Sequence, residues 1–127
     1  MRVTGLDHIV LKVADVERSL AWYQDRLGLA GERVEQWRRG EVPFPSVRID
    51  AGTLIDLLVG APTGTNLDHL CLVLDDADLD ALVASGEFDL VGDGPIDGLF
   101  GARGYARSLY VRDPDGTVVE LRSYPDS

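Results

Sequence analysis

Residues 6–11 read Leu-Asp-His-Ile-Val-Leu, and residues 67–72 read Leu-Asp-His-Leu-Cys-Leu. The only two histidines of the chain, His8 and His69, stand at the same place in the two copies, at an offset of 61 residues. A segment that recurs in this way is typical of a fold built from a duplicated unit. The sequence therefore predicts two similar halves that share one fold.

Each copy is followed by an acidic turn and a stretch with helical character, at residues 14–23 and 75–83. Short acidic side chains are suitable helix N-caps, and glycine is suitable just after the last turn of a helix. The expected caps are Asp15, Asp75 or Asp76 at the starts, and Gly28 and Gly86 at the ends.

Three short strand candidates follow each helix. They are Gly31–Arg38, Pro45–Asp50 and Thr53–Val59 in the first half, and Phe88–Val91, Arg107–Arg112 and Thr117–Ser123 in the second. Residues 113–116, Asp-Pro-Asp-Gly, suit a type I turn between the last two strands. Residues 60–65 contain glycine and proline and form the expected linker. Each half is thus predicted as βαβββ, which places the chain in the α+β class.

Alternation along the strands predicts which side chains share a face. In the strand 53–59, the apolar Ile55 and Leu57 point away from Asp56. The same alternation sets Glu120 against Val119 and Leu121. One face of the sheet is expected to be apolar and to carry the helices. The residues expected on the other face are His8, Asp56, His69 and Glu120, and the carboxylates have an offset of 64 residues, close to that of the histidines.

Imidazoles and carboxylates on a partly buried face need a partner, and a divalent cation satisfies several of them at once. Two histidines with one carboxylate and open positions describe the facial triad of non-haem iron. A second carboxylate gives a mixed nitrogen and oxygen site for zinc, nickel, cobalt or manganese. The pattern therefore predicts one divalent metal ion, of a kind that the residues leave open.

Longer segments around these residues resemble a known family. They are residues 6–11, Trp22-Tyr23, residues 27–29 (Leu-Gly-Leu), residues 67–69 and residues 110–121. Together they are similar to the vicinal-oxygen-chelate superfamily, which includes glyoxalase I, the bleomycin- and fosfomycin-resistance proteins and the extradiol dioxygenases. The resemblance implies a single domain over 1–127, with βαβββ modules at about 1–60 and 66–124. The two modules would form a cup-shaped mixed sheet.

The resemblance also implies roles for particular residues. His8, His69 and Glu120 match the three metal ligands shared by metal-dependent members. Asp56 stands where glyoxalase I has a further glutamate, but its side chain is one methylene shorter. Either Asp56 or Glu120 would carry a proton in a glyoxalase-like reaction. A homodimer is a further expectation from the resemblance.

Other side chains are expected near the same face. Arg48, Tyr110 and Arg122 are candidate substrate contacts, with Lys12 and Ser108 as further polar residues. Arg48 and Tyr110 have nearly the same offset as the histidines, 62 residues, so both are expected to point into the cup. Trp37 suits a cavity wall, a core position or a dimer interface equally. The single cysteine, Cys71, lies in an apolar run and is expected to be a small buried residue.

The formal charge of −10 disfavours nucleic acid and anionic membrane surfaces as partners. A small-molecule substrate and a cytoplasmic location are the expectations that remain. The favoured activity is a metal-dependent lyase or isomerase reaction of the glyoxalase kind. The alternatives are an extradiol-type dioxygenase and a metal-free antibiotic-binding protein like the bleomycin-resistance proteins. The acidic charge suits the metal-free binder, whereas the repeated histidines and carboxylates favour an enzyme.

Overall fold

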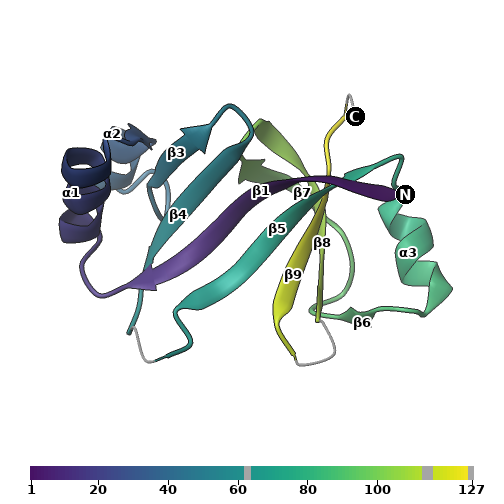
Figure 1. Cartoon of the computed structure of the whole chain (residues 1–127). Helices are drawn as coiled ribbons and strands as arrows, with labels where there is room; N and C mark the ends of the chain where they lie inside the picture. The colour runs from purple at the N-terminus through teal and green to yellow at the C-terminus, as the bar shows by residue number, and fades with distance from the viewer. Residues whose placement is uncertain (62–63, 113–115, 126–127) are drawn as a thin grey trace. The chain divides into compact units, whose positions relative to one another are not determined.

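The computed structural model describes residues 1–61, 64–112 and 116–125 of the chain. Its elements, in chain order, are β1 (Arg2–Val13), α1 (Val16–Leu27), β2 (Ala30–Glu32), α2 (Val34–Arg38), β3 (Ser46–Asp50), β4 (Thr53–Val59), β5 (Leu67–Asp75), α3 (Leu79–Ser85), β6 (Asp89–Leu90), β7 (Ile96–Gly101), β8 (Gly104–Arg112) and β9 (Val118–Ser123) (Figure 1). The predicted α+β class is confirmed. Within the described ranges, no helix is long and apolar enough to cross a membrane.

Two compact units divide the chain. The N-terminal unit comprises His8–Asp68, and the C-terminal unit combines residues 1–7 with the described part of 69–127. The division falls at the two Leu-Asp-His copies, immediately before His8 and immediately before His69. The first residues of β1 therefore belong with the second half of the chain, and Arg2 there forms an ion pair of 3.5 Å with Asp75 of β5.

In the N-terminal unit the strands follow the order β2-β3-β4-β1. β1 and β4 are parallel and lie side by side, whereas β3 is antiparallel to both β2 and β4 (Figure 1). The predicted caps of α1 are confirmed. Asp15 accepts a hydrogen bond from the Arg18 backbone N–H at 3.1 Å, and Gly28 closes the helix at a φ of 71°, where glycine is favoured.

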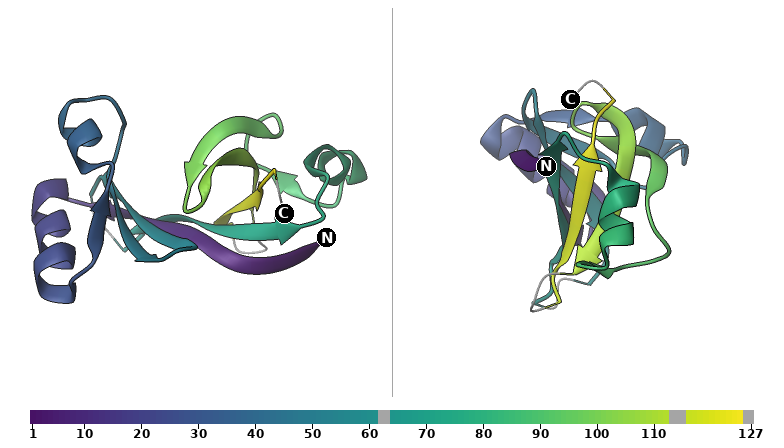
Figure 2. Two further views of the ribbon diagram at one scale, coloured as in Figure 1. Left: turned by 90° about the horizontal axis from the view of Figure 1, so that it is seen from above. Right: turned by 90° about the vertical axis from the view of Figure 1, so that its right-hand side faces the viewer.

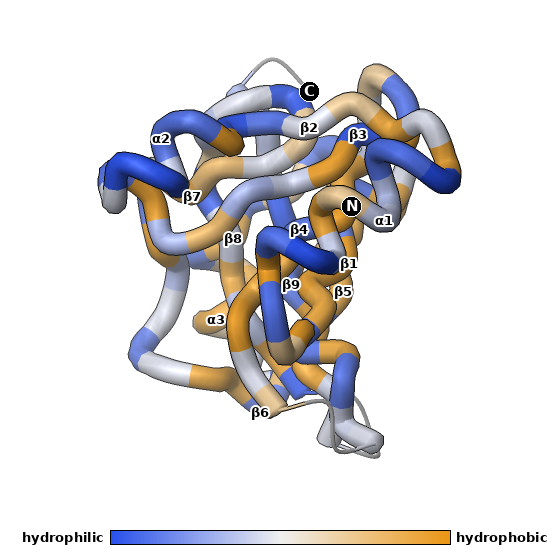
Figure 3. Tube along the Cα trace, turned by 90° about the vertical axis from the view of Figure 1, so that its left-hand side faces the viewer, coloured by the Kyte–Doolittle hydropathy of each residue, from blue (hydrophilic) through white to orange (hydrophobic). Residues whose placement is uncertain are grey.

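The core of this unit lies between α1 and the apolar face of the sheet. Its buried members are Val16 and Leu20 from α1 with Val47 and Leu57 from the strands. Alternating hydrophobic and hydrophilic residues are visible along the strands in Figure 3. Leu57 faces the core, and its neighbour Asp56 faces the other side, as the alternation predicts.

In the C-terminal unit the strands follow the order β5-β9-β8-β6, and β7 pairs with β8 in a curved hairpin (Figure 2). β5 and β9 are parallel, and β8 and β9 are antiparallel. The core contains Leu79 of α3 against Leu109 and Leu121 of the sheet, among others. This arrangement repeats the parallel and antiparallel pairs of the N-terminal unit.

The predicted start of the second helix is two or three residues too early. Asp75 is the last residue of β5, and Asp76 adopts a left-handed conformation with a φ of 50°. The chain bends at Asp76 before α3 begins. Asp78 is therefore the N-cap, and its side chain accepts a hydrogen bond from the Ala81 backbone N–H at 3.1 Å. The predicted end is confirmed, with Gly86 at a φ of 70°.

The predicted strand Gly31–Arg38 is wrong after its first two residues. Arg33 adopts a φ of 57°, which ends β2, and α2 follows. Val34 and Trp37, three residues apart, both pack against the core, so tertiary contacts outweigh the strand pattern. The C-terminal unit also has one strand more than predicted, β7, because Gly98 at a φ of 71° makes its sequence look like a loop.

Two predicted connections cannot be compared in full. Residues 113–115 of the expected type I turn and residues 62–63 of the expected linker lie outside the described residues. The strands on either side of each connection are described, with β8 ending at Arg112 and β9 beginning at Val118.

Candidate functional site

The strand register of the N-terminal unit brings an imidazole to a carboxylate. Val10 of β1 stands opposite Asp56 of β4, and His8 lies two residues before Val10, on the same side of the strand. His8 Nε2 is 3.8 Å from Asp56 Oδ2. On the neighbouring strand, Ser46 stands opposite Asp56 and donates its hydroxyl to Oδ1 at 2.5 Å. We call His8, Asp56 and Ser46 the N-terminal half-site.

The C-terminal unit repeats this register. Cys71 of β5 stands opposite Glu120 of β9, and His69 lies two residues before Cys71. His69 Nε2 is 3.0 Å from Glu120 Oε1, and Ser108 donates its hydroxyl to Glu120 Oε2 at 2.7 Å. We call His69, Glu120 and Ser108 the C-terminal half-site. In each half-site, one carboxylate oxygen is held by a serine and the other lies toward a histidine.

Burial makes these side chains expensive to leave without compensation. Asp56 is 2% exposed and Glu120 is 1% exposed. A buried carboxylate costs free energy unless hydrogen bonds, a cation or protonation compensates it. Each serine supplies one hydrogen bond to its carboxylate, and each remaining oxygen lies on the side of an imidazole nitrogen.

The distances show how well each pair suits one cation. Ligand bonds of about 2.0–2.2 Å place two adjacent ligand atoms about 3.0–3.5 Å apart in tetrahedral or octahedral geometry. The 3.0 Å between His69 Nε2 and Glu120 Oε1 fits that range. The 3.8 Å between His8 Nε2 and Asp56 Oδ2 exceeds it. The donor set therefore fits a metal of the nitrogen- and oxygen-binding kind, and Asp56 fits less well than Glu120.

Tyr110 stands opposite Glu120 on β8, and its ring meets the His69 ring edge-on with centroids 5.4 Å apart. Burial, and then the charge of Glu120, raise the pKa of the Tyr110 hydroxyl. The phenol therefore stays protonated and can donate a hydrogen bond. Its contact with His69 makes it part of the surroundings of the C-terminal half-site.

Arg48 is engaged by β2 and by the turn that follows β3. Its Nε pairs with Glu32, and its NH1 donates to the backbone carbonyls of Asp50 and Ala51 at 3.0 and 3.2 Å. The strand register does not make Arg48 and Tyr110 equivalent positions, although their offset is close to that of the histidines. The register sets Ser46 against Asp56 just as it sets Tyr110 against Glu120, because the two repeats differ slightly in length.

The other candidates contact protein atoms. Arg122 is 0% exposed and donates to Glu120. Trp37 is half-buried against the core of the N-terminal unit. Cys71 is buried, and burial raises the pKa of its thiol, in agreement with the expected small buried residue. Substrate contacts by Arg48, Tyr110, Arg122 and Trp37 stay predictions.

Ser46 was the residue that sequence reasoning missed. Alternation along β3 places Ser46 and Arg48 on one side, which was a usable signal. Its position opposite Asp56 depends on the register between β3 and β4, which includes an irregularity between Arg48 and Asp50. Ser108 was expected on the polar face, and it lies there, bonded to Glu120.

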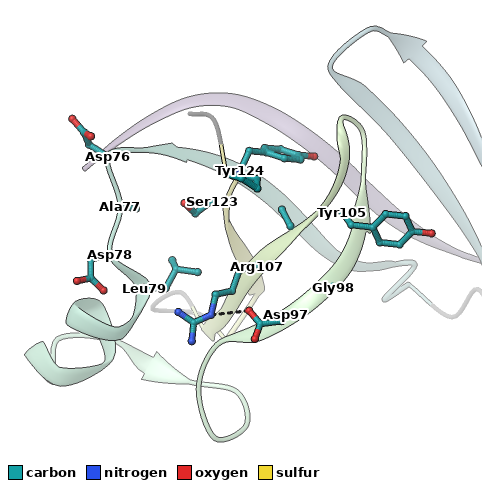
Figure 4. Close-up of a pocket in the computed structure, with 12 residues that line it drawn as sticks. Asp76, Ala77, Asp78, Leu79, Asp97, Gly98, Tyr105, Arg107, Ser123 and Tyr124 are labelled. Carbon is teal, nitrogen blue, oxygen red and sulfur yellow. Dashed lines mark ion pairs between the residues drawn. The ribbon is translucent and has the colours of Figure 1, made fainter.

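A pocket of about 770 Å³ opens elsewhere in the C-terminal unit (Figure 4). Asp76, Asp78 and Asp97 are among the residues that line it, and Arg107 forms a 3.0 Å ion pair with Asp97. The residues that line it in the described part of the chain include none of the predicted site residues. The two half-sites are therefore the stronger candidates for chemistry.

Comparison with known proteins identifies the family. The family model described as "Glyoxalase/Bleomycin resistance protein/Dioxygenase superfamily" matches residues 5–121. A glyoxalase domain-containing protein of Mycosarcoma maydis is 33% identical over 131 residues, covering 100% of this chain and 72% of that protein. A probable lactoylglutathione lyase of Vibrio parahaemolyticus is 27% identical over 124 residues, covering 90% of this chain and 86% of that protein.

Solved structures show the same fold. The crystal structure of methylmalonyl-CoA epimerase from Mycobacterium tuberculosis has a TM-score of 0.65 and 22% identity, and covers 98% of this chain and 91% of that chain. The protein belongs to the glyoxalase, bleomycin-resistance and dioxygenase superfamily. The predicted resemblance is thereby confirmed. The superfamily contains enzymes and also proteins of other kinds, so the activity must be argued from the half-sites.

Proposed function

We propose that the protein is a divalent-metal-dependent enzyme that acts on a small substrate through two neighbouring oxygen atoms. The reaction is of the lyase or isomerase kind seen in glyoxalases. The observation that carries the proposal is the repeated register, in which each unit aligns a histidine and a carboxylate in the same way. Two histidine and carboxylate pairs together supply the mixed nitrogen and oxygen donors that one divalent cation binds.

In this proposal His8, His69 and Glu120 hold one cation of Zn, Ni, Co, Mn or Fe(II), and Asp56 is a weaker fourth donor. The bound cation would act as a Lewis acid and stabilise negative charge on a substrate oxygen. Ser108 and Ser46 orient the carboxylates. Tyr110, protonated beside His69, can donate to an oxygen of the substrate.

Asp56 is the better candidate for moving a proton. Its Oδ1 is held by Ser46, and its Oδ2 is 3.8 Å from His8, too far for both to be adjacent ligands with ordinary bond lengths. A carboxylate beside a metal-bound substrate can accept a proton from one carbon and return it to the next. The 27% identity to a probable lactoylglutathione lyase supports a reaction of this type.

A metal-free binding protein for a cationic antibiotic is the second candidate. The formal charge of −10 favours it, because a negative surface attracts cations. Dioxygenase chemistry, which needs Fe(II) and a catechol, is a third outcome of the same experiment. A homodimer in the cytoplasm stays a prediction, and light scattering during size-exclusion chromatography checks the dimer.

Elemental analysis of protein purified without a metal-affinity column tests the proposal. We expect a divalent metal to copurify, and expect Zn, Ni, Co, Mn or anaerobic Fe(II) to raise the melting temperature of the apo protein. A metal present at 100 times its Kd stabilises by about 2.7 kcal/mol. The loaded protein is then assayed with the hemithioacetal of methylglyoxal and glutathione, and with catechols.

The matched variants are His8→Ala and His69→Ala, with the exposed Arg112→Gln as a control. Both histidine variants should lose the thermal shift and the activity, and the control should keep them. If no metal copurifies, none raises the melting temperature, and a cationic antibiotic binds equally well to wild type and His8→Ala, the sequestering function replaces the enzyme.

A further inference from the structure

A fully buried arginine lies directly beside Glu120. Arg122 follows Glu120 by two residues on β9, so both side chains lie on the same face, and Arg122 is 0% exposed. Its NH1 donates to Glu120 Oε2 at 3.2 Å and approaches Ser108 Oγ at 3.3 Å. Since Ser108 also donates to Oε2 at 2.7 Å, this oxygen is held from two sides.

The guanidinium group of Arg122 is enclosed by Leu99, Gly101, Gly104, Tyr124 and Asp7, and we call this enclosure the seat of Arg122. Its NH2 donates to the backbone carbonyls of Gly104, at 2.8 Å, and of Leu99. A Cβ on Gly101 would lie 2.5 Å from Arg122 Cζ, closer than real contacts allow. The seat therefore requires glycine at 101, which lets the guanidinium approach the backbone.

The remaining sides of the seat carry an aromatic ring and an acid. The Cζ of Arg122 is 4.8 Å from the centroid of the Tyr124 ring, and its Nε is 3.6 Å from Asp7 Oδ2. Asp7 is itself fixed by the Ala102 N–H at 2.8 Å and by the Tyr124 hydroxyl. Arg122 therefore occupies one position, which makes it a rigid donor to Glu120.

The fold alone does not need an arginine here. The corresponding residue of the N-terminal unit, two positions after Asp56, is Leu58. A buried ion pair is often no more stabilising than an apolar residue of similar size. The difference between Leu58 and Arg122 therefore points to a task that Glu120 has and Asp56 has not.

We propose that Arg122 and Ser108 form a clamp on Glu120, in which Arg122 is a positioning residue. The clamp holds Oε2 and leaves Oε1, beside His69, as the single Glu120 oxygen for the cation. This inference rests on the proposed metal site. The clamp adds a division of roles to the proposed metal site. A clamped Glu120 is a fixed ligand, which leaves Asp56 as the residue that carries the proton.

The test measures the Co²⁺ affinity and the visible absorption spectrum of apo protein loaded with Co²⁺. The variants are Arg122→Lys and Ser108→Ala, with Arg112→Gln as the matched control. Groups that orient metal ligands are typically worth about 10–100-fold in metal affinity. We expect losses of that size in both clamp variants, and a changed spectrum as Glu120 becomes free to turn both oxygens to the ion.

Repeating the two substitutions in a Glu120→Ala protein separates an effect on the position of Glu120 from a general disturbance of the metal site. In Glu120→Ala, Arg122→Lys and Ser108→Ala should cause little further loss of Co²⁺ affinity, because the residue that they position is gone. If Arg122→Lys fails to fold, as judged by near-ultraviolet circular dichroism, Ser108→Ala decides, since it keeps the arginine.

The outcomes have distinct meanings. If wild type binds Co²⁺ and folded Ser108→Ala and Arg122→Lys keep the affinity within about twofold and the same spectrum, the clamp is refuted and the metal site stands. Equal losses in the Glu120→Ala background also refute the clamp. If wild type binds none of Co²⁺, Zn²⁺, Ni²⁺, Mn²⁺ and anaerobic Fe²⁺, the proposed function fails, and the role of the clamp toward a metal fails with it.

Discussion

The two half-sites share one plan and differ in three details. In both, a histidine and a carboxylate come from parallel neighbouring strands, and a serine holds one carboxylate oxygen. The imidazole and carboxylate are 3.0 Å apart in the C-terminal half-site and 3.8 Å apart in the N-terminal one. A duplicated unit has thus kept its donors while it changed how firmly they are held.

The other two differences lie next to the carboxylates. Arg122 stands where the N-terminal unit has Leu58, and Tyr110 stands where it has Ser46. In the C-terminal half-site, Glu120 is therefore bonded to a buried arginine as well as to a serine. In the N-terminal half-site, Asp56 has a shorter side chain and lies farther from its histidine. In the proposed metal site, this difference makes Glu120 the fixed ligand and Asp56 the candidate proton carrier.

Replacing Asp56 should have the largest effect on turnover. Asp56→Asn keeps the size and one acceptor oxygen but cannot take up a proton, so we expect kcat to fall about 10²–10⁴-fold. Metal affinity, measured by isothermal titration calorimetry, should fall less than about tenfold. An Asp56→Asn variant that binds the metal at least about 100-fold more weakly but keeps normal kcat at saturating metal would reverse the roles assigned to the two carboxylates.

Replacing Glu120 should act mainly on the metal. Glu120→Ala removes a fixed ligand and leaves Arg122 buried without that carboxylate, so we expect metal affinity to fall at least about 100-fold. Competition with a chromogenic chelator measures the affinity. Leu58→Ala, at the place equivalent to Arg122, is the control and should leave the affinity within a few-fold. Similar losses of metal affinity in Glu120→Ala and Leu58→Ala would contradict the difference proposed between the two half-sites.

Gly101→Ala should reduce stability because its methyl group would collide with the guanidinium of Arg122. We expect a loss of about 1–3 kcal/mol in the free energy of unfolding, typical of overpacking. Gly5→Ala is the matched control, since its nearest heavy atom is Arg103 NH2 at an ordinary 3.7 Å. Urea unfolding followed by circular dichroism measures both, and equal stability of the two variants would contradict the seat.

The smallest effect concerns Cys71, which occupies the place in the C-terminal unit that Val10 has in the N-terminal unit. Burial raises the thiol pKa above its ordinary 9.0, so the unfolded chain loses this proton first as pH rises. The folded state then binds more protons, and this residue lowers stability by about 1.4 kcal/mol per pH unit above pH 9. In the apo protein, Cys71→Val should show a shallower decline, and parallel stability curves from pH 8 to 10.5 would refute this.

Much of this architecture follows from local patterns. The repeated Leu-Asp-His segments located both histidines, and strand alternation placed Asp56 and Glu120 on the face away from the core. Asp15 and Gly28 were predictable as caps because capping depends on a few neighbouring residues.

The features that sequence reasoning missed depend on contacts between distant residues. The serine partner of Asp56 follows from the register of β3 on β4, and α2 follows from the packing of Val34 and Trp37 on the core. The seat of Arg122 joins Asp7, Gly101 and Gly104, which no short motif connects. A single sequence contains each of these residues but does not indicate that they meet.

The number of cations bound per chain tests the central claim most directly. Apo wild type, His8→Ala and His69→Ala are titrated with Co²⁺ and followed by calorimetry and visible absorption. The account predicts one ion per chain in wild type and at least about 100-fold weaker binding in each histidine variant, because both half-sites serve one ion. Two ions per chain, with one lost in each variant, would contradict it, and so would a wild type that binds none.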